Sequence, residues 1–208
     1  TIDELDASLL PKITDPFRYG GLSDRIRRCQ DKGLAVMGMP PHLGGEIFET
    51  AWRLRGFRQL LMDLRHNREL ADYLFDQITA MLIHNAVALA RAGVDILCLD
   101  DDVGCPTSMI VSPAMWREFL KPRMMKTIEF AKKAKPDIFT LYHSDGSIEP
   151  IIPDLIEMGV DALNPVQPDV MDPAMLKEEY GDRLAFWGTI GTQTLWAWGR
   201  PRDIEREV

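Results

Sequence analysis

The sequence predicts an α/β fold, specifically a (β/α)8 barrel that is present as an incomplete fragment of about five βα units. Three observations predict it. Short apolar runs alternate with helical patterns about five times along the 208 residues. The apolar runs are continuous rather than alternating, which is typical of parallel strands covered on both faces. Most runs end in polar or glycine-rich residues, and barrels of this kind carry their active sites at the carboxyl ends of the strands.

A doubly wound sheet is the alternative architecture for the same alternation. A dinucleotide-binding fold of that kind carries a G-x-G-x-x-G turn after a strand. Neither Gly20-Gly21 nor Gly44-Gly45 matches that turn, so the barrel is favoured. Five strands cannot close an eight-stranded barrel. Because the chain starts at Thr1 and its last letters resemble the start of a helix, we expect residues 1–208 to be a partial barrel domain cut at both ends.

The predicted elements follow one another in a regular order. Helices are predicted where apolar residues recur at three- and four-residue steps or capping residues flank the run; they cover residues 24–32, 46–65, 68–91, 112–135, 148–158 and 172–181. Strands are predicted at the continuous apolar runs; they cover residues 34–40, 94–99, 137–142, 160–163 and 183–187.

Glycine, proline and capping residues set the boundaries in the first half. The first helix closes at Gly33, and the first strand stops at Pro40. The second helix is expected to break at Gly56. Asn67 is the predicted N-cap of the long third helix, which Gly93 ends.

The same signals set the boundaries in the second half. The fourth helix is predicted to begin with Ser112 as its cap and Pro113 in its first turn. Pro122 should kink this helix. Gly159 closes the fifth helix, and Asp172 precedes the proline that opens the sixth.

Composition excludes several classes of protein. The net charge is −8, which disfavours nucleic-acid binding because phosphate neutralisation requires a basic surface. No apolar run approaches about 18 residues, so no membrane-spanning helix is expected. The three cysteines form no CxxC pair, which argues against a disulfide framework or a structural zinc knuckle and favours a reducing cytoplasm.

Three consecutive aspartates, Asp100, Asp101 and Asp102, follow the second predicted strand. Adjacent carboxylates repel one another more strongly as water is excluded, so such a run is costly inside a core. It is reasonable at a site that binds a cation, donates a proton or contacts a polar substrate. A solvated loop with an N-cap role is the alternative. Because the run stands at the end of a strand, we predict Asp101 and Asp102 as catalytic residues.

His143 and Asp145 end the next strand. Residues i and i+2 of an extended chain face the same side, so the two side chains would project together. Such a pair can bind zinc or another divalent ion, or transfer a proton. We predict His143 as a catalytic residue and, with Asp145, as a metal ligand, and a further ligand is needed. The alternative is a loop histidine beside a helix-capping aspartate. His42 is a weaker candidate at the first strand end.

Neutral polar side chains stand at or near the strand ends and are predicted to bind the substrate through hydrogen bonds: Tyr142, Asn164, Gln167 and Gln193. Each is equally plausible as a satisfied loop residue. Trp187 is predicted to lie in the core. Trp196 and Trp198 are expected to line the barrel mouth or a subunit contact, such as that of a homodimer.

Several motifs resemble the uroporphyrinogen-decarboxylase (URO-D) superfamily. The resemblance covers residues 90–208 in order, and it is carried by residues 101–104, 111–122, 143–146, 151–159, 160–167 and 184–193. It implies a (β/α)8 barrel, which agrees with the fold predicted from the order of strands and helices. The His143-Ser-Asp-Gly146 stretch is similar to the corrinoid-dependent methyltransferase and O-demethylase branch.

The resemblance implies a methyl transfer between a small methylated substrate and a corrinoid carried by a partner protein, with a divalent metal such as zinc at the barrel mouth. Two alternatives stay open. One is the cofactor-free uroporphyrinogen decarboxylase of porphyrin biosynthesis, a lyase. The other is a non-catalytic corrinoid-binding module.

The sequence departs from the family pattern at two positions. Thiol-using methyltransferases of this superfamily have His-x-Cys, whereas Asp145 stands at the place of that cysteine. A carboxylate is a harder ligand than a thiolate and suits a different metal or a weaker site. Relatives also tend to carry aspartate where this chain has Gly191.

Overall fold

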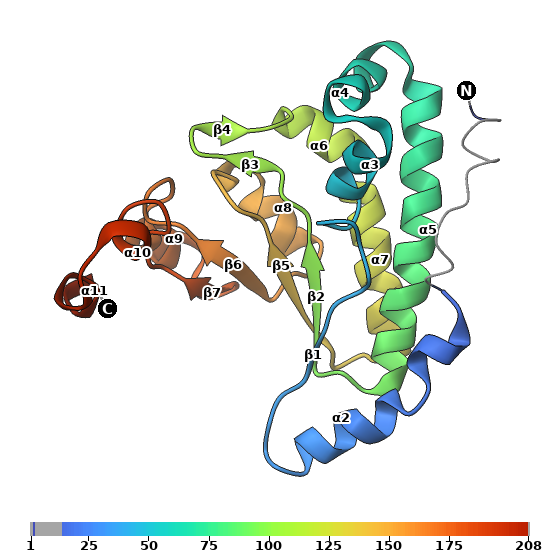
Figure 1. Ribbon diagram of the computed structural model, residues 1–208, viewed down its shortest axis with the longest axis horizontal. Coiled ribbons are helices and arrows are strands. Elements are labelled where there is room, and N and C mark those ends of the chain that lie inside the picture. The colour runs from blue at the N-terminus through green and yellow to red at the C-terminus, as the bar shows by residue number, and fades with distance from the viewer. Residues whose placement is uncertain (1, 3–13, 208) are drawn as a thin grey trace.

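The computed structural model describes Ile2 and residues 14–207. Within them it confirms the α/β fold: a parallel five-stranded sheet has the order β1-β2-β5-β6-β7 and is covered by helices (Figure 1). The sheet is open, as expected for part of a barrel. Thr1 and Val208, the first and last residues, lie outside the described residues.

Four strands are close to the predicted positions: β2 Ile96–Asp100, β5 Phe139–His143, β6 Ala162–Val166 and β7 Ala185–Gly188. Strand β1 covers only Met37–Gly38, and strands β3 Gly104–Cys105 and β4 Ser108–Met109 were not predicted. Strands β3 and β4 form a small separate hairpin. The α-helices are α2 Leu22–Gln30, α3 Phe48–Arg55, α4 Phe57–His66, α5 Arg68–Ala92, α6 Pro113–Phe119, α7 Lys121–Ala134, α8 Ile152–Glu157, α9 Pro173–Tyr180, α10 Leu195–Trp198 and α11 Pro201–Glu207. Among the described residues, 3₁₀ helices cover Pro16–Tyr19 and Glu149–Ile151.

Helix boundaries confirm most of the capping signals. The Ser112 hydroxyl accepts a hydrogen bond from the Met115 backbone N–H at 3.2 Å, so the predicted N-cap of α6 is confirmed. The predicted helix 112–135 divides at Leu120, next to the proline at position 122. Asn67 precedes α5 as expected, but its side chain makes no capping hydrogen bond, so that part of the prediction is wrong.

Residues that pair across neighbouring strands form rows of side chains, and successive rows face opposite sides of the sheet. Leu99 pairs with Tyr142, which pairs with Leu163, and all three are fully buried in the core beneath the helices. Helices α5, α7 and α8 lie on that side of the sheet (Figure 1). Because successive side chains of a strand point to opposite faces, the next row faces away from these helices. That row is Asp100, His143 and Asn164.

Two predictions at the edges of the sheet are wrong. Trp187 was predicted in the core, but it lies on the edge strand β7 and is 56% exposed. The buried strand predicted over residues 34–40 shrinks to the two residues of β1, and Leu34 is 57% exposed. Edge strands have a pairing neighbour on one side only, so continuous apolar sequence does not guarantee burial there.

Candidate functional site

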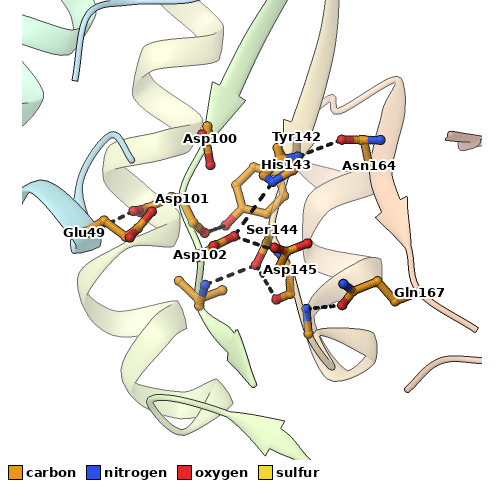
Figure 2. A network of polar contacts seen from close by, with 12 residues as sticks. Glu49, Asp100, Asp101, Asp102, Tyr142, His143, Ser144, Asp145, Asn164 and Gln167 are labelled. Atoms are coloured by element: carbon orange, nitrogen blue, oxygen red, sulfur yellow. Dashed lines mark hydrogen bonds and ion pairs between the residues drawn. The ribbon is translucent and has the colours of Figure 1, made fainter. Parts of the chain in front are cut away.

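Three side chains that could bind a metal ion lie close together at the carboxyl ends of β2 and β5 (Figure 2). Asp100, Asp102 and His143 each offer one ligand atom, and these atoms all lie within 4.8 Å of one another. We call these three residues the acidic cluster. Two donor atoms bound to one ion at about 2.1 Å are at most about 4.2 Å apart. Small side-chain rotations would therefore bring all three donors onto one cation.

His143 is oriented by Asn164 on the neighbouring strand. The Asn164 side-chain nitrogen donates to the Trp187 carbonyl at 3.2 Å, which turns the amide oxygen toward the imidazole. That oxygen lies 2.6 Å from His143 Nδ1. Because the oxygen is an acceptor, Nδ1 carries a proton, and in the neutral ring Nε2 keeps its lone pair. The free nitrogen lies 4.0 Å from Asp102 Oδ1.

Asp102 also holds the start of the next loop. Its Oδ1 accepts a hydrogen bond of 2.6 Å from the Asp145 backbone N–H. The Asp145 side chain is exposed, and its pKa is raised by partial burial and by the charge of Asp102. Strand β5 ends at His143, so the same-side rule for extended chains does not extend to Asp145. Asp145 thus lies beside the acidic cluster, and its role as a ligand remains a prediction.

Asp101 has a different environment from its two neighbours. Its carboxylate accepts hydrogen bonds from the backbone N–H groups of Phe48 and Glu49, both at 3.0 Å. These contacts give hydrogen-bond acceptors to two backbone N–H groups at the start of α3, which have no partner within the helix. The side chain is 1% exposed, and burial raises its pKa to about 7 although the two N–H groups favour the charged form. The carboxylate is thereby occupied as a helix cap, and its catalytic role remains a prediction.

Asp100 was not among the catalytic residues predicted from the sequence. It lies beside His143 at the strand end, where Asp101 was expected. It pairs in register with His143, and both belong to the row that faces away from the helices. Burial raises the pKa of its carboxyl, whereas the charges of His143 and His42 lower it. The signal that could have identified it is the length of β2, which ends one residue later than predicted.

The predicted substrate-binding residues differ in accessibility. Tyr142 is fully buried and donates its hydroxyl to the Asp101 carbonyl at 3.1 Å. The Gln167 amide uses both ends, because its oxygen accepts from the Gly146 N–H at 2.7 Å and its nitrogen donates to the Thr192 hydroxyl at 2.9 Å. The Gln193 side chain is exposed. Contact of any of these residues with a substrate remains a prediction.

The donors of the acidic cluster are oxygen and nitrogen atoms, and no cysteine belongs to it. Cys98 is buried, and Cys105 lies in the hairpin with its sulfur 3.4 Å from the Ser108 hydroxyl. Two carboxylates and an imidazole fit a divalent cation of hard or borderline character. This donor set does not fit a thiolate-bound zinc. Separately, no helix in the described part of the chain is both long and apolar enough to cross a membrane.

Comparison with known proteins gives a consistent assignment. The family model described as uroporphyrinogen decarboxylase (URO-D) matches residues 43–208. A curated protein named methylcobamide:CoM methyltransferase MtaA, from Methanosarcina barkeri, is 30% identical over 124 residues. That alignment covers 60% of this chain and 34% of the relative.

A solved structure of a methyltransferase from Methanosarcina mazei has the same fold, with a TM-score of 0.62 at 24% identity. The match covers 80% of this chain and 47% of that protein. The chain therefore spans about a third to a half of the relatives that it matches.

Proposed function

The chain belongs to the uroporphyrinogen decarboxylase family, and from this premise we propose that it is a methyltransferase. It moves a methyl group between a small methylated substrate and a corrinoid carried by a partner protein. The similarity to a methylcobamide-dependent methyltransferase supports this reaction. The observation that carries the proposal is the acidic cluster, where Asp100, Asp102 and His143 converge at the carboxyl edge of the sheet.

The acidic cluster is suited to hold a divalent cation. When bound, the cation supplies Lewis acidity at the heteroatom that loses or gains the methyl group. His143 offers Nε2 because Asn164 occupies Nδ1, and Asp102 lies on the Nε2 side of the ring. Asp100 adds a second carboxylate, whose raised pKa matches its partly buried position. Three protein ligands and an open position are typical of catalytic metal sites.

The charge around the acidic cluster weighs against porphyrinogen decarboxylation. A porphyrinogen carries many carboxylates, which require cationic partners. The charges that act most strongly on Asp100 are two imidazoles and the carboxylates of Asp102 and Asp145. The nearby cation Arg53 is paired with Glu49 at 3.3 Å. An acidic rim favours a metal ion or a neutral or cationic substrate over a polyanion.

Methyl transfer from free methylcobalamin tests the proposal. The protein is incubated with zinc or cobalt(II) and with thiol, phenol and amine acceptors, and loss of the methyl–cobalt absorbance is followed. We expect turnover that falls at least about 100-fold in Asp102→Asn and His143→Gln, and that is unchanged in His84→Gln on the outer helix α5. Decarboxylation of uroporphyrinogen without methyl transfer would support the lyase alternative. Corrinoid binding without either reaction would support the non-catalytic module.

A further inference from the structure

A loop between β1 and α3 lies against the acidic cluster and carries a second histidine, His42. The loop is fastened to the end of β2. The Glu46 N–H donates to the Asp100 carbonyl at 2.6 Å, and the Asp100 N–H donates back to the Glu46 carboxylate. Two further backbone N–H groups, at the start of α3, donate to Asp101. Hydrogen bonds in both directions thus tie the loop to the aspartate run.

The loop fits this position closely because Gly45 has no side chain. A Cβ atom at that position would lie 3.0 Å from the Asp100 carbonyl oxygen and 2.5 Å from a Glu49 carboxylate oxygen. The Thr50 hydroxyl donates to the Gly45 carbonyl at 2.6 Å and accepts from the Leu43 N–H at 3.1 Å. The residues on either side of Gly45 are therefore fixed relative to β2.

The His42 ring faces Asp100. Its Nε2 lies 3.9 Å from Asp100 Oδ2, which is too long for a hydrogen bond but close to the spacing of two donors on one ion. The other contact of Nε2 is the Met39 sulfur at 3.1 Å, a weak acceptor. Within the described part of the structure Nδ1 is buried without a hydrogen-bond partner. Buried ring nitrogens are normally satisfied, so Nδ1 lacks an expected partner, and Nε2, the nitrogen that faces Asp100, has only the weak sulfur contact.

A second unsatisfied atom stands nearby. Glu46 is 2% exposed, and its Oε1 has no hydrogen-bond partner among the described residues. Burial, with the charge of Asp101 added, raises the pKa of this carboxyl well above its usual range. The loop therefore brings both an imidazole and a buried carboxyl to the Asp100 side of the cluster.

We propose that His42 is a fourth ligand of the cation held by Asp100, Asp102 and His143, an inference that rests on the metal role in the proposed function. The site then contains two imidazoles and two carboxylates from three segments of the chain. Such a set favours zinc, cobalt(II) or another borderline divalent ion, and it needs no thiolate. The loop before α3, and not only the strand ends, then determines metal affinity.

Cobalt(II) is the probe for the test, because its visible absorption reports both binding and ligand type. We expect His42→Gln to lower cobalt(II) affinity at least about 10-fold, as loss of even an outer-shell partner does at metal sites, and to change the visible spectrum. His84→Gln should bind as the wild type does. Melting curves of the metal-free variants verify that the loop substitution has not unfolded the protein. Equal affinity and an equal spectrum in His42→Gln would overturn the inference, as would absence of cobalt binding by the wild type.

A second pair of variants gives a positive readout. In His42→Cys the new sulfur would ligate the ion, so we expect a thiolate-to-cobalt charge-transfer band that the wild type lacks. His84→Cys, on the outer helix, should show no such band. A missing band in His42→Cys that still binds cobalt would also count against ligation. Methyl transfer is measured separately. If the protein shows no methyl transfer but its cobalt(II) affinity still depends on His42, the methyltransferase proposal is wrong and the inference about His42 holds.

Discussion

The Asn164 amide oxygen lies 2.6 Å from Nδ1 of His143, on the ring nitrogen that points away from the acidic cluster. The two residues pair in register across β5 and β6. This contact fixes the ring plane and leaves Nε2 directed at Asp102. Substrate binding by Asn164 remains a prediction, and from this contact we propose that Asn164 also positions His143.

Asn164→Ala should therefore weaken metal binding without removing a ligand. Outer-shell partners of ligating histidines contribute about 10- to 100-fold to metal affinity. We expect a loss of this size in cobalt(II) or zinc titrations. Gln193→Ala, an exposed polar residue of the same region, is the matched control and should bind normally. An unchanged affinity in Asn164→Ala, with the fold intact, would mean that the amide does not orient the ring.

The fold could be predicted from the sequence because its signals are local. Continuous apolar runs and helical periodicity predicted β2, β5, β6 and β7 and the segments that form α2 to α9, but not the β3–β4 hairpin or α10. The Ser112 and Asp172 side chains cap their helices through hydrogen bonds. The edge of the sheet could not be predicted, since burial of Trp187 depends on what packs beyond β7 and not on its own segment.

The residues of the acidic cluster were predicted to within one position, and their chemical roles remain predictions. Side chains of a strand alternate in direction, so an error of one position in the strand end exchanges the two faces. With β2 ending at Asp100, that residue aligns with His143, and Asp101 turns toward α3. His42 was only a weaker candidate from its position after the first predicted strand, because its place beside Asp100 depends on hydrogen bonds between segments that are distant in the sequence.

Asp101→Ala distinguishes a helix cap from a catalytic acid. The substitution leaves the buried N–H groups of Phe48 and Glu49 without their acceptor. We expect unfolding free energy to fall by about 1–3 kcal/mol, measured by urea denaturation. Asp101→Asn keeps one acceptor oxygen and should lose less. If Asp101→Ala instead keeps full stability and abolishes methyl transfer, the carboxylate acts in catalysis.

Acid stability should depend on Asp154, which lies in α8 and is not part of the acidic cluster. Burial alone would raise the pKa of this carboxyl, but hydrogen bonds from Arg117 and Lys121 outweigh it and hold the pKa below its usual value. A lowered folded-state pKa adds stability above the unfolded-state pKa of about 3.9, and this stability is lost as the pH falls below that value.

Asp154→Asn should consequently lower the unfolding free energy by about 1–2 kcal/mol at pH 7 and by less near pH 3. The measurement is urea denaturation at both pH values. Asp182→Asn removes a carboxylate that is 80% exposed beside Arg183 and should change stability by less than about 0.5 kcal/mol. An equal loss at both pH values would show that the ion pairs do not carry the effect.

Gly146 couples the acidic cluster to the hairpin, and its substitution tests that coupling. Its φ is +80°, and an added Cβ would lie 2.5 Å from the Cys105 nitrogen and from the Gly104 carbonyl carbon. Gly33 has a similar φ of +74° but open space around the same position. Gly33→Ala should therefore cost only the left-handed backbone strain, about 1–2 kcal/mol.

Gly146→Ala carries the same strain and in addition a clash with backbone that cannot rotate away. We expect its unfolding free energy to fall by at least about 1 kcal/mol more than that of Gly33→Ala. The clash also pushes apart the segments that carry Asp102 and Asp145, which share a 2.6 Å hydrogen bond, so cobalt(II) affinity should fall in Gly146→Ala and not in Gly33→Ala. The two substitutions differ in the space around the new methyl group. If both variants lose the same unfolding free energy and keep the wild-type cobalt(II) affinity, the hairpin does not support the cluster.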